Sequence, residues 1–147
     1  MKLSEPQKIS EQHMNELLSP MLSEGEKSLC PIFCVFVLSR GFFAPSSSTF
    51  AGYAACTSGG RLLTVHFGDL FNEGQSRAYD ISAAKNMKIR KTILGEYRIN
   101  AAFPAGETNV KLRIQAAKKV YGLAGRNFPN QERNLEKMVE ILRGYVV

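Results

Sequence analysis

The sequence predicts a mainly β domain of seven strands that ends in one helix. Short stretches rich in Ile, Val, Phe and Tyr recur between residues 29 and 115 and are separated by Gly, Ser, Pro and Asn, as in strands joined by turns. Apolar residues from position 130 onward instead recur at helical spacing, and Gly144 follows them. With 147 residues, 44% hydrophobic and 22% charged, the chain suits one folded domain and excludes collagen, a coiled coil or disorder.

Residues 1–28 are predicted to form a helical appendage ahead of a domain that spans residues 29–147. Ser4 can cap its first helix, Pro20 can break the helix, and Gly25 can end it. From residue 29 the pattern becomes that of strands. Strands are expected at residues 29–38, 52–57, 61–67, 77–81, 86–93, 96–103 and 109–115, and the final helix runs from an Asn130 cap to Arg143.

The last three strands are predicted to form an antiparallel meander, because each alternates apolar with polar residues. A three-residue loop at residues 93–95 joins the first two and places Gly95 where a left-handed backbone is required. This turn sets Arg90 opposite Arg98. The simplest extension into the third strand pairs Arg98 with Arg113, so that three arginines form a row.

The positive charge of the chain is concentrated in this meander. The whole chain carries a net charge of +6, and residues 85–128 alone hold ten basic and two acidic residues. Because apolar residues alternate with them, the segment is predicted to be folded sheet with its cations on the outer face. The candidate ligand-binding residues on this face are Lys88, Arg90, Arg98, Lys111 and Arg113.

Several short motifs resemble those of bacterial pleckstrin-homology (PH)-like domains. They are EGEKSL at 24–29, GYAACT at 52–57, RLL at 61–63, KKVYGL at 118–123 and NQERNL at 130–135. The resemblance covers about residues 24–144 and implies a seven-stranded bent sandwich, or partly open barrel, capped by the C-terminal helix. It implies a scaffold rather than a reaction. The inositol-phosphate site of other PH domains does not carry over, because the first two strands and their loop hold only Arg40.

The sequence contains no catalytic or metal-binding motif, so we expect neither an enzyme, a cofactor nor a small-molecule substrate. Cys30, Cys34 and Cys56 form an odd set in a chain without an export signal, which favours reduced core thiols and a cytoplasmic protein. His13 and His66 lack the companions of a metal site and are expected to be ordinary surface or core residues. The longest apolar run, residues 31–38, is too short to cross a membrane.

Two interpretations of the cations compete. Long side chains can simply splay into water and keep the sheet soluble. Alternatively, like charges directly opposite one another cost some tenths of a kcal/mol, which favours an acidic partner over the face. The leading functional hypothesis is a non-enzymatic module for protein binding or self-association. The acidic stripe Glu132, Glu136 and Glu140 of the last helix could meet the basic face of a second copy, or could be a solvated helix face.

Anionic lipid is the alternative partner. Five cations contribute about 5 kcal/mol, or a dissociation constant of about 0.2 mM, so stable membrane binding needs a second anchor. The candidate anchor is the loop with Gly41, Phe42, Phe43 and Phe50, whose phenylalanines could equally fold onto the core. Nucleic acid ranks lower, because the outward positions of the basic strands include no aromatic residue for stacking.

Overall fold

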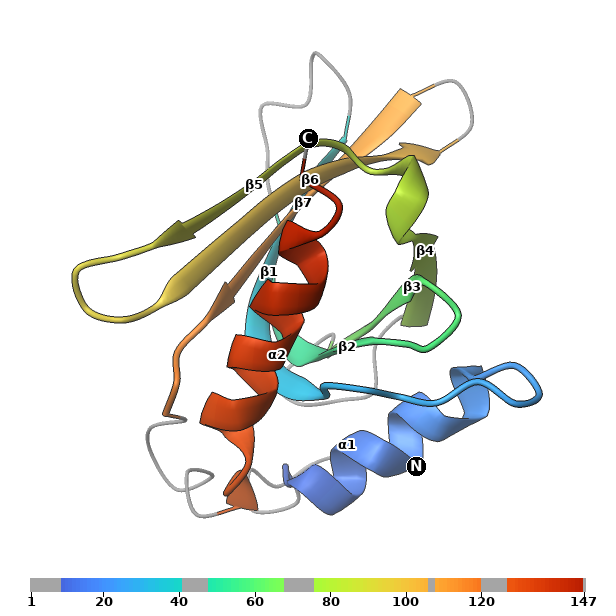
Figure 1. Ribbon diagram of the computed structural model, residues 1–147, viewed down its shortest axis with the longest axis vertical. Coiled ribbons are helices and arrows are strands. Elements are labelled where there is room, and N and C mark those ends of the chain that lie inside the picture. The colour runs from blue at the N-terminus through green and yellow to red at the C-terminus, as the bar shows by residue number, and fades with distance from the viewer. Residues whose placement is uncertain (1–8, 41–47, 68–75, 106–107, 120–126, 147) are drawn as a thin grey trace.

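The structure is a computed structural model that describes residues 9–40, 48–67, 76–105, 108–119 and 127–146. Seven antiparallel strands form one sheet in the order β4-β3-β2-β1-β7-β6-β5, and this sheet curls into a half-barrel with one helix on its inner side (Figure 1). The strands are β1 Ile32–Arg40, β2 Ser48–Cys56, β3 Arg61–His66, β4 Ser76–Asp80, β5 Lys85–Lys91, β6 Tyr97–Ala105 and β7 Thr108–Ala116. The helices are α1 Glu11–Leu18 and α2 Gln131–Arg143, with 3-10 turns at Ser19–Met21 and Ile81–Ala83.

This arrangement is the predicted PH-like fold of seven strands and a C-terminal helix. The main difference from the expected boundaries lies in β2, which begins at Ser48 instead of residue 52. Thr49 and Phe50 extend the strand because they pair with Val37 and Phe36 of β1. The expected long loop is therefore shorter than residues 39–50, and residues 41–47 lie outside the described ranges.

The inner side of the half-barrel holds the larger core. Inward residues of β1, β6 and β7 pack against one face of α2, whose buried residues have the predicted helical spacing. Its almost fully buried members include Ile32, Phe36, Ile99, Ile114, Leu135, Met138 and Leu142. The three cysteines lie in the same core as free thiols, as the sequence predicted.

The side chain of Gln131 takes the place of a strand where β1 and β7 separate. The ladder between these strands begins at Val35 and Gln115, so the backbone of Phe33 has no partner in β7. Instead, the Phe33 N–H donates to Gln131 Oε1 at 3.0 Å, and Gln131 Nε2 donates to the carbonyls of Phe33 at 2.8 Å and Ala117 at 3.1 Å. Buried backbone groups need such partners, and the amide thereby ties the start of α2 to the sheet.

A second core lies on the outer side of β2 and β3, where α1 covers the sheet. Met14 and Leu18 of α1 pack against Tyr53, Leu63 and Val65, and all five are almost fully buried. The described part of the predicted appendage, residues 9–28, is therefore a third layer over one half of the sheet. Residues 1–8, which include the expected Ser4 cap, lie outside the described ranges, and Ser10 caps α1 through its side chain.

The carboxylate of Glu26, a half-buried residue, fastens the segment after α1 to the turn between β2 and β3. Arg61 donates to Glu26 through both Nε and Nη2, and Nη2 also donates to the Met21 carbonyl at 2.8 Å. Glu26 also accepts hydrogen bonds from the Thr57 hydroxyl and from the Ser23 N–H. These donors, Arg61 foremost, lower the pKa of Glu26 to about 2.

Both histidines are buried. His13 Nδ1 lies 2.8 Å from the Tyr53 hydroxyl oxygen under α1. His66 lies inside the half-barrel between Phe36 and Phe50, with the Phe50 ring centroid 4.6 Å away. Burial lowers the pKa of His66, and the nearby Arg77 lowers it further, so its ring is neutral near pH 7. They are core histidines, one of the two ordinary roles expected from the sequence.

Candidate basic interface

The three strands β5, β6 and β7 carry their apolar and basic residues on opposite faces. Ile89, Ile99 and Ile114 are cross-strand neighbours, and their side chains face α2 and the inner core. The residues between them point to the outer side. All five predicted binding residues lie there and are exposed: Lys88, Arg90, Arg98, Lys111 and Arg113.

The hairpin between β5 and β6 has the predicted turn and register. Gly95 has a φ of +83°, in the left-handed region that favours glycine. The Thr92 N–H donates to the Glu96 carbonyl at 2.7 Å, and the Gly95 N–H donates to the Thr92 carbonyl at 3.0 Å. Arg90 consequently pairs with Arg98, as predicted.

The predicted register between β6 and β7 is wrong by two residues. Arg113 pairs with Asn100, and Arg98 pairs with Gln115. The ladder between the two strands continues to the pair of Ala105 and Thr108, whereas the prediction ended the strands at residues 103 and 109. A shift of two residues keeps every side chain on its predicted face of the sheet, so the five cations still share the outer side.

The expected row of three arginines therefore does not form. Only Arg90 and Arg98 lie directly opposite one another, while Arg113 Nε donates to Asn100 Oδ1 at 2.8 Å. Polar partners at Asn100 and Gln115 separate the remaining cations and reduce the like-charge cost.

Lys85 adds a sixth cation that the sequence analysis missed. It pairs with Ala102, which in turn pairs with Lys111, so all three share the outer side. A bulge between Lys85 and Lys88, with Asn86 at a φ of 55°, allows two residues that are three apart to face the same way. Strict alternation would have placed Lys85 on the other face. The basic face, as the name is used below, consists of Lys85, Lys88, Arg90, Arg98, Lys111 and Arg113.

The charge of the basic face is not neutralised within the described part of the chain. Each of its six side chains is exposed, and among the described residues none forms an ion pair with a carboxylate. The two ion pairs in that part lie elsewhere, between Arg61 and Glu26 and between Lys118 and Glu136. An anion brought to the basic face therefore displaces no acidic residue of those ranges.

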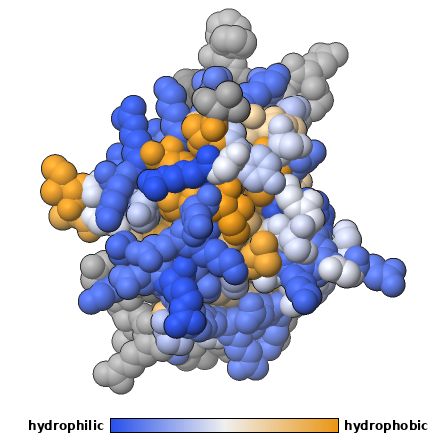
Figure 2. Space-filling model, in the orientation of Figure 1, coloured by the Kyte–Doolittle hydropathy of each residue, from blue (hydrophilic) through white to orange (hydrophobic). Residues whose placement is uncertain are grey.

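Two apolar side chains stand at the end of the same hairpin. Ile93 and Leu94 are 104% and 93% exposed, and Figure 2 shows apolar atoms projecting at the left, where Figure 1 places the turn between β5 and β6. The turn was predicted from its glycine, and its two apolar residues were not predicted to be an anchor. The sequence pattern that could have identified them is two large apolar residues in a three-residue loop, where their side chains do not face the core.

The membrane anchor suggested by the sequence, the loop with Gly41, Phe42, Phe43 and Phe50, is described by the structure only at Phe50. Gly41, Phe42 and Phe43 lie outside the described residues. Phe50 is half-buried in β2 and packs its ring on His66, so it belongs to the inner side of the sheet. Phe50 therefore folds onto the core, the second of the two options.

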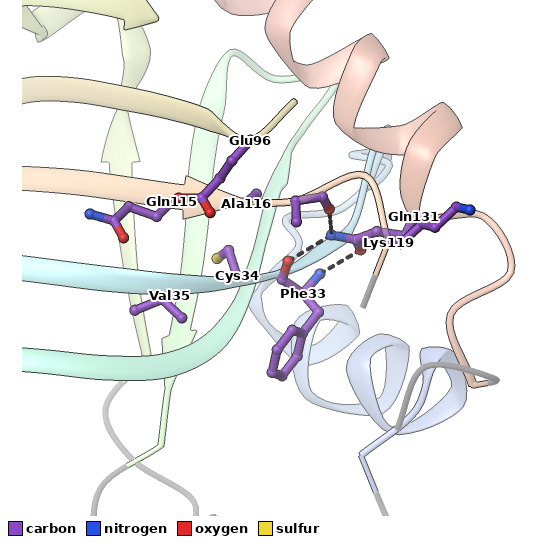
Figure 3. A pocket seen from close by; sticks show the side chains of 9 residues that line it. Phe33, Cys34, Val35, Glu96, Gln115, Ala116, Lys119 and Gln131 are labelled. Atoms are coloured by element: carbon purple, nitrogen blue, oxygen red, sulfur yellow. Dashed lines mark hydrogen bonds between the residues drawn. The ribbon is translucent and has the colours of Figure 1, made fainter. Parts of the chain in front are cut away.

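Two small hollows lie beside the turn end of the hairpin. One, of about 200 Å³, is lined by residues that include Cys34, Glu96, Lys119 and Gln131, and Figure 3 shows the Gln131 amide bonded to the strand backbone beside it. Burial raises the pKa of the Cys34 thiol, so the sulfur stays protonated and is a poor nucleophile. The other, of about 400 Å³, is lined by residues of both charges, including Glu96, Lys118, Lys119 and Glu132.

The acidic stripe of α2 lies on the other side of the sheet from the basic face. Glu132, Glu136 and Glu140 are all exposed on α2, which packs on the inner side. Lys118 Nζ lies 3.2 Å from Glu136 Oε1, and this contact raises the pKa of Lys118. The stripe is thus partly neutralised by the end of the meander rather than by its own helix.

Comparison with models of known protein families gives no match, and neither does comparison with curated protein sequences. Within the described residues, no group of three His, Cys, Asp or Glu side chains is arranged to hold a metal ion. None of the helices described is long and apolar enough to cross a membrane.

Proposed function

We propose that this chain is a non-enzymatic docking module of the bacterial PH-like kind, and that its basic face binds an acidic surface. The observation that carries the proposal is six exposed cations on one face without an acidic partner among the described residues. Such a face attracts and orients an anionic partner at long range. The attraction weakens as salt screens the charges.

A purely solubilising role accounts less well for the pairing of Arg90 with Arg98. Like charges directly opposite on a sheet destabilise it by some tenths of a kcal/mol, and a mixed-charge surface would keep the sheet equally soluble. An acidic partner bound over the two arginines would relieve this repulsion, and the relief would favour binding.

An acidic protein, or a second copy of the chain, is one partner that fits the face. The glutamate stripe of α2 supports self-association, because stripe and face lie on opposite sides of the sheet and could meet head to tail. The ion pair between Lys118 and Glu136 weakens this case, since it leaves the stripe less charge to offer.

An anionic bilayer is the second partner that fits. At about 1 kcal/mol for each cation near the membrane, six cations contribute up to about 6 kcal/mol, or a dissociation constant of tens of micromolar. That affinity is weak and salt-sensitive. Nucleic acid is less well supported, because the described outward residues of β5–β7 include no aromatic ring on which a base could stack.

The test is charge reversal at the centre of the face. Arg98→Glu removes one cation and adds one acidic charge, so at about 1 kcal/mol per charge it should weaken salt-sensitive binding about thirtyfold. Binding is measured as self-association by light scattering and as sedimentation with vesicles that contain phosphatidylserine. Arg133→Glu is the matched control, because it makes the same charge change at an exposed position of α2. Equal binding by Arg98→Glu and the parent chain in both assays would leave the face a solubilising surface only.

A further inference from the structure

We propose that the acidic surface is an anionic bilayer, and that the β5–β6 hairpin inserts Ile93 and Leu94 into it. This inference rests on the proposed function and identifies the partner of the same face. The sequence alone placed lipid second, because the phenylalanines of its candidate anchor could equally fold onto the core and no other exposed anchor had been identified. The turn of this hairpin supplies one.

The turn presents both side chains fully to solvent. Ile93 and Leu94 are 104% and 93% exposed, whereas the other large exposed hydrophobic residues described, Tyr145 and Val146, are only 39% and 44% exposed. Hydrogen bonds between Thr92 and Glu96 close the turn, and the left-handed Gly95 fixes its shape. The projecting pair therefore loses little conformational freedom on insertion, and part of the turn's backbone is already hydrogen-bonded.

Cations surround the apolar pair at the depth of lipid headgroups. Arg90 lies three residues before Ile93 and is paired with Arg98, which places both about 10 Å behind the tip at ~3.3 Å per residue. Lys91 lies nearer the turn, its Nζ 5.7 Å from the Tyr97 ring centroid. Interfacial apolar residues enter a bilayer by about 5–10 Å, so these cations would lie among the phosphates.

A second copy of the chain fits this hairpin less well. The larger hollow, between the turn and the start of α2, is lined by Leu94 and Gly95 of the turn itself. It also has side chains of both charges, Glu96, Lys118, Lys119 and Glu132. A hairpin whose apolar tip is followed by three cations would meet mixed charge there. An anionic bilayer offers both an apolar interior for the tip and a continuous negative surface for the basic face.

Insertion should strengthen binding by a measurable factor. Complete burial of one aliphatic side chain is equivalent to about tenfold in affinity, so the pair should contribute about a hundredfold over the cations alone. The double variant Ile93→Ser/Leu94→Ser should lose about that factor with phosphatidylserine vesicles. Because both side chains are fully exposed, the variant should retain its fold. Val146→Ser is the matched control and should bind like the parent chain.

Tryptophan fluorescence reports insertion directly, because the chain has no tryptophan of its own. We expect the emission of Leu94→Trp to shift to shorter wavelength with vesicles of phosphatidylcholine and phosphatidylserine, and to be quenched by brominated acyl chains. Phosphatidylcholine alone should produce neither effect. Val146→Trp should be unaffected by either vesicle.

The outcomes separate this inference from the proposed function. If the parent chain ignores phosphatidylserine vesicles at low salt, the bilayer is the wrong partner, and the scattering assay with Arg98→Glu still tests the basic face. If the parent binds but the double variant binds equally and Leu94→Trp does not shift, insertion is wrong and the basic face stands. Loss of self-association in the double variant, without loss of vesicle binding, would assign the tip to a second copy and overturn the inference.

Discussion

The two halves of the sheet differ in what lies over their outer faces. In the half that contains β2 and β3, α1 covers the outer face, and Tyr53, Leu63 and Val65 are buried beneath it. In the half made of β5, β6 and β7, none of the described residues covers the same face, which carries six exposed cations. In the described part of the chain, one half is therefore a three-layered support, and the other is a two-layered platform with an exposed outer face.

The strands of the two halves also differ in their burial patterns. Every residue of β3 from Leu62 to His66 is buried, whereas in β5 only Met87 is fully buried and the charged positions are exposed. A strand covered on both faces needs apolar residues at successive positions, and one covered on a single face needs alternation. The contrast between β3 and β5 therefore distinguishes support from platform.

The largest effect is expected in the support. Leu63→Ala removes a fully buried outward side chain beneath α1 and should lower the free energy of unfolding by about 2–5 kcal/mol. Urea denaturation measures this change. Ile93→Ala in the platform is the control and should change stability by less than about 0.5 kcal/mol. Similar losses for both substitutions would remove the distinction between the two halves.

A smaller loss is expected where α2 joins the sheet. Gln131→Met keeps the side-chain length but leaves the N–H and carbonyl of Phe33 and the carbonyl of Ala117 without their side-chain partner. We expect a loss of about 1–3 kcal/mol in urea denaturation. Gln115→Met, on the outer side of β7, should be nearly neutral. A neutral Gln131→Met would mean that water satisfies this backbone equally well.

The carboxylate of Glu26 makes the support sensitive to acid. Its pKa is lowered to about 2 in the folded chain from an ordinary value of 4.5, chiefly because Arg61 donates to it. A depressed pKa stabilises the fold above the unfolded value, and that stabilisation is lost as pH falls from about 4.5 toward 2. Melting temperatures across this range should fall more steeply for the parent than for Glu26→Gln. Parallel curves would contradict the assignment.

The smallest effect on stability is expected in the platform. Arg98→Ala removes an exposed side chain that faces Arg90, so the change should lie within about 0.5 kcal/mol and tend toward stabilisation. Denaturation in low salt measures it most sensitively, because salt screens the repulsion. A large destabilisation would mean that Arg98 supports the fold and that binding assays with its variants are uninformative.

Alternation and turn chemistry were enough to predict the seven strands, the final helix and the side on which the five cations lie, while the bent sandwich was implied by the resemblance to PH-like domains. Gly95 fixed the β5–β6 register, and a two-residue error between β6 and β7 left the face unchanged. Lys85 escaped prediction because the bulge at Asn86 breaks the alternation on which the prediction depended.

Long-range packing was beyond the sequence pattern. Nothing local indicates that α1 covers β3 or that the Gln131 amide replaces a strand beside Phe33, because both depend on where distant elements meet. The start of α2 also depends on a distant element, because the Asn130 side chain makes no capping hydrogen bond within the helix that it was predicted to cap. Its side chain and N–H donate to Glu11 at 2.9 and 2.8 Å, so α1 caps α2 across the molecule.

Hydrogen exchange with and without phosphatidylserine vesicles tests the central claim most directly. The account predicts slower exchange at the turn between β5 and β6 and along the outer edge of β5, with no change in α1 or in the β2–β3 turn. Protection centred on α1, or spread evenly over both halves of the sheet, would contradict the claim that the bare half of the sheet is the docking surface.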